Sequence, residues 1–353
     1  MRLPLKVEQV TSAWLTEALQ FRFPGVEVTQ IRIEDVISGT STKIRVRCEY
    51  NDLGREASLP CTLIVKGGFE THSPDMKEMY ATEIRFYRDV QPFVPIRSPR
   101  CYFAGSDPES YQSIVIIEDL KARGVEFLHA QRPQRYPEVA RRLTDMARYH
   151  ARTWNSPEFV PGGRFDWVGS RFSGWSLEYQ DRYFVPEVWQ QYVSSPRGAA
   201  VSTRLHDRTA VRRALRRIGE IEATEPACLI HGDTHLGNLY VEMDGTPGFF
   251  DAQVARAPWH LEVSYHMTCA LDIPDRRAWE QALLVHYLEA LKANGVGTPS
   301  HEAAWLSYRC SLAYGFFIFL INETRFQTEA VNTAYAARFG AAMLDHSTLD
   351  LLG

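Results

Sequence analysis

Two carboxylates and one amide lie at the ends of short apolar segments in the middle of the chain. Asn238 stands five residues after Asp233, inside a loop with apolar residues on both sides. Asp251 directly follows the run Gly248–Phe250, which a turn separates from the first pair. Because turn residues between two apolar segments favour their pairing, we expect the three polar side chains to lie close together.

Phosphoryl transfer requires side chains of this kind. The transferred group carries dispersed negative charge, and Mg²⁺, which prefers a few hard oxygen ligands, must bridge its oxygens. We therefore predict Asn238 and Asp251 as magnesium ligands and Asp233 as the catalytic base that takes a proton from the acceptor. The alternative is that Asp233 and Asn238 are turn and cap residues between strands, which the additional Asp251 disfavours.

Lys66 and Glu83 form a second, independent signal. Lys66 ends an apolar run typical of a strand, and Glu83 lies on the apolar stripe of a helix expected at residues 76–90. A lone carboxylate on a core-facing stripe is costly unless it is paired, so Lys66 is its predicted partner. In kinases such a lysine contacts the nucleotide phosphates and the glutamate positions it. Alternatively, Lys66 is a strand end in solvent and Glu83 merely borders the stripe.

Two weaker patterns concern nucleotide contacts. The first is a loop of small residues, Ser38, Gly39, Thr40 and Ser41. Its backbone N–H groups and hydroxyls could fold over phosphates, although a plain hairpin loop fits almost equally well. The second is the strand end from Glu118 to Leu120, which would be the hinge of a kinase fold, with the backbone of these residues facing the adenine. Other enzyme classes are disfavoured, because neither HExxH nor GxSxG occurs.

The pattern along the chain changes from strands to helices near residue 120. Apolar and polar residues alternate over residues 43–50, as in a half-buried strand. Further strands are expected at Val28 to Ile37, Cys61 to Lys66 and Ser113 to Ile117. One helix is expected among these strands, at residues 76–90, and helices follow at 139–154, 276–291 and 304–321. The predicted fold class is therefore mixed α+β, with a β-rich lobe over residues 1–120 and a larger helical lobe over residues 121–353.

Composition and charge are those of an ordinary globular protein. A net charge of −4 gives no electrostatic reason to expect a nucleic acid or an anionic membrane as partner. The arginine run from Arg204 to Arg217 has helical spacing and is interpreted as a solvated helix face, with a phosphate or nucleic-acid surface as the minor alternative. The apolar run over residues 313–321 is shorter than the roughly 20 residues of a membrane span. Cysteines without CxxC spacing and the lack of an apolar signal core lead us to expect a cytoplasmic location.

Several short segments occur in the order known from one family. The most specific are HGDxxxxN at His231 to Asn238 and Asp251-Ala252-Gln253. The others, in chain order, are Ser38 to Ser41, Val65-Lys66, Glu83 to Tyr87, Ile117 to Leu120, and His150-Ala151 with Trp154. In these segments the chain resembles the aminoglycoside phosphotransferase and choline-kinase-like superfamily. Within it, the resemblance is greatest to the ecdysteroid-kinase-like (CHK kinase-like) group and its bacterial relatives.

This resemblance implies a two-lobed protein-kinase-like fold that uses ATP and Mg²⁺ to phosphorylate a small-molecule hydroxyl or amine. It implies the roles given above for Asp233, Asn238, Asp251, Lys66 and Glu83. Two positions depart from the family pattern. Ala252 stands where a tryptophan is frequent, and Glu262 stands where an aspartate is common.

The acceptor is expected to bind in the helical lobe beside Asp233. The region from Phe165 to Tyr192 is dense in aromatic side chains, among them Trp167, Phe172, Trp175, Tyr179, Tyr183, Phe184, Trp189 and Tyr192. They could line a site for an apolar or ring-shaped alcohol, or they could be ordinary helix core. A polycationic aminoglycoside would need a cluster of carboxylates, which this region lacks. An aminoglycoside-type kinase and a nucleotide-binding pseudokinase or scaffold are the alternative functions, and the sequence predicts no oligomeric state.

Overall fold

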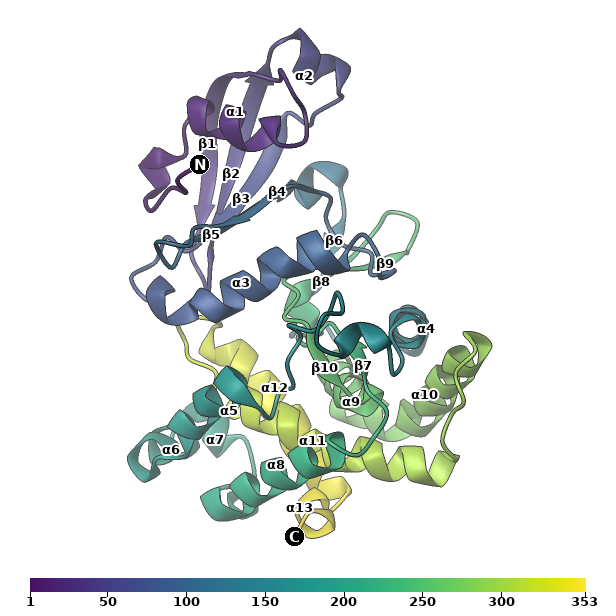
Figure 1. Cartoon of the computed structure of the whole chain (residues 1–353). Helices are drawn as coiled ribbons and strands as arrows, with labels where there is room; N and C mark the ends of the chain where they lie inside the picture. The colour runs from purple at the N-terminus through teal and green to yellow at the C-terminus, as the bar shows by residue number, and fades with distance from the viewer. The chain divides into compact units, whose positions relative to one another are not determined.

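The computed structural model describes all 353 residues of the chain, which form two compact units. The first unit comprises Met1–Phe93 and Arg97–Glu126, and the second comprises Val94–Ile96 and Phe127–Gly353. A β-sheet dominates the first unit and helices dominate the second (Figure 1). The predicted mixed α+β fold class is confirmed.

A five-stranded antiparallel sheet is the centre of the first unit. Its strands lie in the order β1-β2-β3-β5-β4. Their bounds are Val28–Ile37 (β1), Thr42–Tyr50 (β2), Thr62–Gly67 (β3), Cys101–Ser106 (β4) and Ser113–Glu118 (β5). In β2, Ile44, Val46 and Cys48 are buried whereas Arg47 and Glu49 are exposed, so one face of the strand packs on the core. The four predicted strands are confirmed, and β4 was not predicted.

Three helices accompany this sheet, so the expectation of a single helix is wrong. They are α1 (Ser12–Gln20), α2 (Asp52–Glu56) and α3 (Lys77–Arg85). The hydroxyl of Thr11 caps α1 by accepting the N–H of Trp14, and Trp14 packs edge-on against Phe103 in the core. The helix predicted at residues 76–90 is α3, and a π-helical turn, Phe86–Val90, continues it.

Ten helices and several short strands make up the second unit. The helices are α4 (Tyr136–Arg152), α5 (Gly174–Asp181), α6 (Pro186–Val193), α7 (Pro196–Ala199), α8 (Arg208–Glu222), α9 (Trp259–Ala270), α10 (Ile273–Ala293), α11 (His301–Ile321), α12 (Glu329–Asp345) and α13 (Thr348–Leu351). Its strands are β7 (Cys228–Ile230), β8 (Leu239–Val241), β9 (Pro247–Phe249) and β10 (Ala255–Ala257), and the two-residue strand β6 (Glu126–Phe127) includes the last residue of the first unit. They pair as β10-β7 and as β6-β8-β9. The three helices predicted in this region correspond to α4, α10 and α11 and are confirmed.

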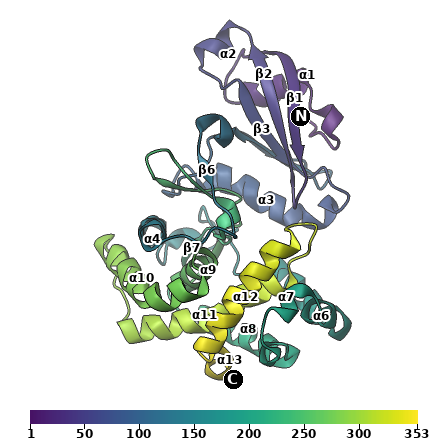
Figure 2. The ribbon, with the colours of Figure 1, turned by 180° about the vertical axis from the view of Figure 1, so that it is seen from behind.

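Helices α9 and α11 form the core of the second unit. Every residue of α9 is buried, and α11 runs beside α12, as Figure 2 shows from behind. By length and composition alone, the whole of α11, unlike the run of residues 313–321, could cross a membrane. However, 72% of its most apolar window is buried inside the protein, and buried core helices of soluble proteins pass the same test.

Candidate functional site

Two antiparallel strand pairs hold the predicted catalytic residues of the second unit together. β7 pairs with β10, and β8 pairs with β9. Beyond the strand ends, the N–H of Gln253 donates to the carbonyl of His231 at 3.0 Å, and the N–H of Phe250 donates to the carbonyl of Asn238 at 3.0 Å. Asp251 therefore stands one residue beyond the backbone partner of Asn238. The predicted pairing of the two apolar segments is confirmed.

Asp233 is half-buried, and its carboxylate is held from two sides. The Nδ2 of Asn238 donates to Oδ2 of Asp233 at 2.8 Å and to its backbone carbonyl at 3.0 Å. The hydroxyl of Tyr265, on α9, donates to Oδ1 at 2.9 Å. Burial, together with the nearby charge of Asp233, raises the pKa of the Tyr265 hydroxyl well above its usual range, so it acts as a donor at neutral pH. These contacts fix the orientation of the Asp233 carboxylate.

A buried carboxylate anchors the backbone of the same loop. Oε1 of Glu262 accepts the N–H of Gly232 at 2.8 Å, while Oε2 accepts the hydroxyl of Tyr149 at 2.6 Å and lies 2.9 Å from Nε2 of His150. Burial alone would raise the pKa of Glu262, but the hydrogen bond and charge of His150 outweigh it and lower the pKa. Glu262 thus carries a charge that ties α9 and α4 to the residue preceding Asp233.

Two residues of the site have left-handed backbone conformations. Gly232 has φ of 83°, and a Cβ at this position would collide with the guanidinium of Arg171 and the carbonyl of Gln253. Only glycine fits there. Asp251 has φ of 57°, which is uncommon for a residue with a side chain. Strained conformations of this kind concentrate at functional sites, where the surrounding structure imposes them.

The donor set of Asn238 and Asp251 fits magnesium. Because its Nδ2 is bound to Asp233, Asn238 offers its amide oxygen as a ligand, and Asp251 offers a half-buried carboxylate. Mg²⁺ commonly takes one or two such oxygens, together with water and substrate phosphates. No group of three or more His, Cys, Asp or Glu side chains is arranged to hold a metal ion.

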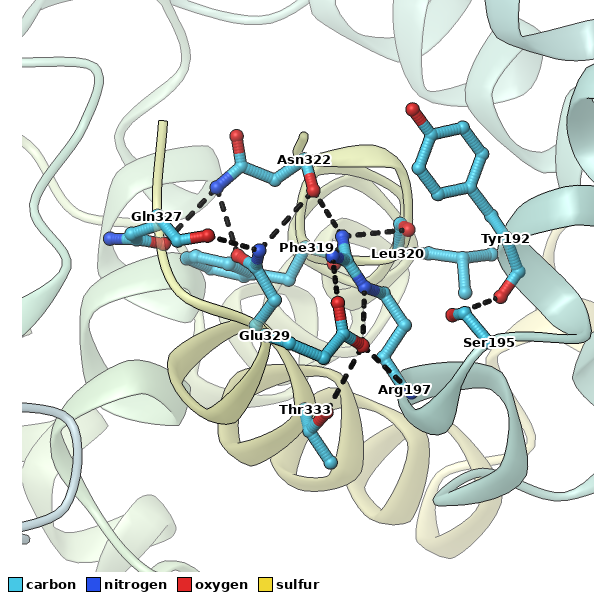
Figure 3. A network of polar contacts seen from close by, with 10 residues as sticks. Tyr192, Ser195, Arg197, Phe319, Leu320, Asn322, Gln327, Glu329 and Thr333 are labelled. Atoms are coloured by element: carbon cyan, nitrogen blue, oxygen red, sulfur yellow. Dashed lines mark hydrogen bonds and ion pairs between the residues drawn. The ribbon is translucent and has the colours of Figure 1, made fainter. Parts of the chain in front are cut away.

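A turn between α11 and α12, residues 322–328, reaches the catalytic loop. Nε2 of Gln327 lies 3.3 Å from Nε2 of His235, whose ring is itself 3.6 Å from the carboxylate of Asp233. Arg197 of α7 holds this turn by donating to backbone carbonyls at the end of α11 and to the carboxylate of Glu329 (Figure 3). A buried arginine therefore sets the position of the turn that contacts the catalytic loop.

The aromatic side chains of residues 165–192 divide into two groups. Phe184 and Trp189 are buried, and the ring of Phe184 stacks on that of Trp189 and on Phe317 of α11. For these residues the helix-core interpretation is confirmed. Trp175 and Tyr179 on α5 are half-buried, with ring centroids 5.2 Å apart. The second group therefore keeps part of its aromatic surface accessible.

A line of aromatic rings leads from Asp233 toward α5. Tyr265, the hydroxyl partner of Asp233, lies 6.2 Å from Tyr314 between ring centroids. Tyr314 in turn lies 5.7 Å from Phe172, which is half-buried just before α5. Packed aromatic side chains thus connect Phe172 with the carboxylate of Asp233.

In the first unit, Lys66 and Glu83 form a buried ion pair. Nζ of Lys66 on β3 lies 2.7 Å from Oε1 of Glu83 on α3, and the residues are 4% and 5% exposed. The pairing predicted from the sequence is confirmed. Because burying two charges costs most of what their attraction returns, such a pair adds little net stability, whereas removing one partner would leave an uncompensated buried charge.

The helix that carries Glu83 also anchors the loop between β1 and β2. This loop comprises Ser38, Gly39, Thr40 and Ser41. The hydroxyl of Tyr80 on α3 donates to the carbonyl of Thr40 at 2.6 Å, and Nε2 of His72 lies 3.3 Å from the same oxygen. The four residues predicted to cover phosphates are thus a hairpin loop whose position depends on α3.

The predicted hinge residues have engaged or buried side chains. The carboxylate of Glu118 accepts the backbone N–H of Arg100 at 2.7 Å and the guanidinium of Arg123 at 2.7 Å. Leu120 is buried and begins a short 3₁₀ helix. Any nucleotide contact of Glu118 and Leu120 would therefore use the backbone.

Comparison with known proteins decides the family. Residues 69–302 match the profile of the APH family, described as the phosphotransferase enzyme family. The chain belongs to this phosphotransferase family. The matched region contains Glu83, Asp233, Asn238 and Asp251, while Lys66 precedes it. A search of curated proteins found no significant match.

Solved structures support the fold of this phosphotransferase. A protein of Ralstonia eutropha JMP134, provisionally described as an aminoglycoside phosphotransferase, is 12% identical with a TM-score of 0.53, covering 95% of this chain and 96% of its own. Choline kinase from Streptococcus pneumoniae is 10% identical with a TM-score of 0.52, covering 94% of this chain and 98% of its own. At these identities the similarity shows the kinase-like fold alone.

Sequence reasoning missed three side chains of the phosphotransferase site. Tyr265 contacts Asp233, Gln327 contacts His235, and Arg171 contacts the carbonyl groups of Gly232 and Gln253. None belongs to a short motif, and each reaches the loop from another part of the chain. Only Tyr265 could have been suspected from the sequence, because it lies three residues after Glu262, close behind the HGDxxxxN segment in the chain.

Proposed function

We propose that this phosphotransferase transfers the γ-phosphoryl group of a nucleoside triphosphate, preferentially ATP, to a hydroxyl of a small molecule. The observation that carries the proposal is the carboxylate of Asp233. It is half-buried, fixed by Asn238 and Tyr265, and lies on a loop that backbone hydrogen bonds tie to the segment of Asp251. A base of defined orientation beside an amide and a second carboxylate suits this reaction.

In the proposed reaction, Asp233 takes the proton of the acceptor hydroxyl while the acceptor oxygen bonds to the γ-phosphorus. The bond between that phosphorus and the bridging oxygen breaks, and the nucleoside diphosphate leaves with the electron pair. A general base held in position contributes about 10²- to 10⁴-fold to such a step. Asn238 and Tyr265 hold the carboxylate of Asp233 in a fixed orientation. Less conformational entropy is therefore lost when the transition state forms.

The phosphates require positive charge and oxygen ligands. Asn238 and Asp251 are the proposed ligands of Mg²⁺, which when bound neutralises charge on the phosphate oxygens. Lys66 is proposed to contact the phosphates, with Glu83 holding its ammonium group in place. The proposed nucleotide-contacting backbone is that of Ser38, Gly39, Thr40, Ser41, Glu118 and Leu120.

The acceptor class that we propose is an apolar or ring-shaped alcohol, in keeping with the resemblance to the ecdysteroid-kinase-like group. Half-buried rings at Phe172, Trp175 and Tyr179 support this choice, because such rings contact apolar ligands well. Two carboxylates of this region are already paired: Glu323, which accepts the hydroxyl of Tyr183 at 3.1 Å, lies 2.9 Å from Arg325, and Asp181 at the end of α5 lies 2.7 Å from Arg212. These two offer a polycation little uncompensated charge.

A panel of acceptors tests this function. The purified protein would be incubated with Mg·ATP or Mg·GTP and with apolar alcohols, choline or aminoglycosides, and nucleoside diphosphate release would be followed. We expect the strongest stimulation with an apolar alcohol and a product heavier by one phosphoryl group. A response confined to aminoglycosides would reject the acceptor class and keep the phosphotransfer. Nucleotide binding without turnover on any acceptor, or on a cell extract, would favour a scaffold.

A further inference from the structure

Arg171 links two backbone segments of the site to each other. Its Nη2 donates to the carbonyl of Gly232 at 3.0 Å and also to the carbonyl of Gln253. Gly232 immediately precedes Asp233, and Gln253 follows Asp251 by two residues. One guanidinium nitrogen thus bridges the segment of the proposed base and the segment of a proposed metal ligand.

The groups around this bridge are tightly packed. A Cβ on Gly232 would overlap both the Arg171 guanidinium and the Gln253 carbonyl, so the three groups are in direct contact. Two further bonds fix the same region, because Gln253 donates to the carbonyl of His231 and Arg256 donates to the carbonyl of Gly169. Movement of Arg171 would therefore shift both segments.

The backbone of Arg171 is held by helix α5. Its backbone carbonyl accepts the side-chain amide of Gln180 at 2.6 Å. Gln180 is buried on α5, the helix that presents Trp175 and Tyr179. Arg171 is thus joined through its backbone to the aromatic helix and through its side chain to the catalytic backbone.

We propose that Arg171 is a positioning residue that transmits the placement of α5 to the alignment of Asp233 and Asp251. The inference rests on the proposed phosphotransfer and acceptor region and adds a route by which acceptor binding promotes the reaction. When an acceptor orders α5, the guanidinium holds both catalytic segments at their working separation. Without the guanidinium the base and the proposed metal ligand keep their chemistry but lose their mutual alignment.

Two substitutions of Arg171 test the proposal, with Arg276 as the matched control. Arg171→Met removes both hydrogen bonds that Nη2 donates. Arg171→Lys keeps a positive charge, but its shorter side chain can replace at most one of the two hydrogen bonds. Arg276 is a buried arginine that pairs with Glu280 within α10 and joins α10 to the end of α12 through Asp345, far from the loop of Asp233 in the chain. Arg276→Met should lower stability and leave kcat within about twofold of the parent.

We expect Arg171→Met to lower kcat by about tenfold to a hundredfold, since small misplacements of reacting groups have effects of that size. The KM for the nucleotide should change by a smaller factor than kcat, because Lys66 is untouched and Asp251, though less well aligned, keeps its carboxylate. Arg171→Lys should recover part of kcat. Two results would overturn the proposal: a kcat of Arg171→Met equal to that of the parent, or a fall in kcat of Arg276→Met as large as that of Arg171→Met.

Hydrogen exchange separates this test from that of the proposed function. Amides of residues 231–238 and 250–255 should exchange faster in Arg171→Met than in the parent, and ligand-free protein suffices for the measurement. Arg276→Met should not change these segments. If the parent transfers no phosphoryl group, the proposed function fails. The exchange experiment still shows whether Arg171 holds the two segments in place. Unchanged exchange in both segments would show that Arg171 does not position them.

Discussion

Replacement of Glu262 by glutamine should weaken both stability and catalysis, although Glu262 is not proposed to touch a substrate. The carboxylate accepts hydrogen bonds from the N–H of Gly232 and the hydroxyl of Tyr149 and pairs with His150. Glutamine has almost the same shape, but it offers one acceptor oxygen and no charge. At least one buried donor therefore loses its partner.

The expected loss follows from the number and kind of these contacts. A hydrogen bond to a charged group contributes about 1.5–3 kcal/mol, and breaking a buried ion pair costs about 3–5 kcal/mol. Because the glutamine side chain of the Glu262→Gln variant would retain one accepted bond, we expect the free energy of unfolding to fall by about 2–4 kcal/mol. Urea denaturation measures this difference.

The activity should fall as well, because the Gly232 amide that Glu262 holds belongs to the residue before Asp233. If the loop of Asp233 is held less tightly, the carboxylate of Asp233 spends less time in the reactive orientation. We therefore expect kcat to decrease by about tenfold or more, with little change in the nucleotide KM. The matched control is Glu225→Gln. Glu225 also pairs with a histidine, His260, at 2.6 Å, but this pair makes no contact with the catalytic loop.

The two variants together decide whether Glu262 acts through the loop. Glu225→Gln should cost about 1 kcal/mol, since Glu225 is partly exposed, and should leave kcat unchanged. If Glu262→Gln lost stability but kept the kcat of the parent, the anchoring account would be refuted.

The pH dependence of stability gives an independent check on Glu262. Its pKa in the folded protein is lowered below the usual value of 4.5, so the unfolded chain binds the proton more readily. The stabilisation is therefore fully present above pH 4.5 and is lost as the pH falls through the folded pKa. The difference between the parent and Glu262→Gln should shrink in that acidic window, and a constant difference would contradict the assignment.

Four further substitutions probe other parts of the structure. Tyr265→Phe removes one of the two side-chain donors to Asp233 and should lower kcat by about tenfold at constant nucleotide KM, as steady-state kinetics would show. Lys66→Met removes the ammonium group that pairs with the buried Glu83 carboxylate and should lower the free energy of unfolding by about 3 kcal/mol. The double variant Lys66→Met/Glu83→Leu should regain this stability. It should not regain nucleotide affinity, which the thermal shift on adding nucleotide would measure. Burial raises the pKa of Glu222 to about 7, so the folded state keeps its proton longer and stability declines as pH rises from 4.5 toward 7. Glu222→Gln should remove this decline, which amounts to at most about 3 kcal/mol, in urea melts at acidic and neutral pH.

The sequence was sufficient for features encoded over short distances. The alternation in β2, the stripe of α3 and the HGDxxxxN segment each follow from neighbouring residues, and the structure contains them. The Lys66–Glu83 pair was predictable because a charge on an apolar stripe demands a partner.

Other features depend on contacts that no local pattern encodes. α1 is short, and its burial depends on packing against Phe103, which is distant in the chain. Arg171 and Gln327 reach the loop of Asp233 from segments that precede α5 and follow α11, both far from this loop in the chain. Arginine and glutamine are common on surfaces, so their types alone gave no reason to place them at the site.

Phosphoryl transfer measured beside nucleotide binding, for the parent, Asp233→Asn and Asp251→Ala, tests the central claim most directly. The parent should transfer the γ-phosphoryl group to its acceptor. Asp233→Asn should bind Mg·ATP as the parent does but transfer at least about a hundredfold more slowly, because the amide cannot take the proton. Asp251→Ala should lose affinity for Mg·ATP itself. Transfer by Asp233→Asn at the rate of the parent would contradict the account, whatever acceptor is used.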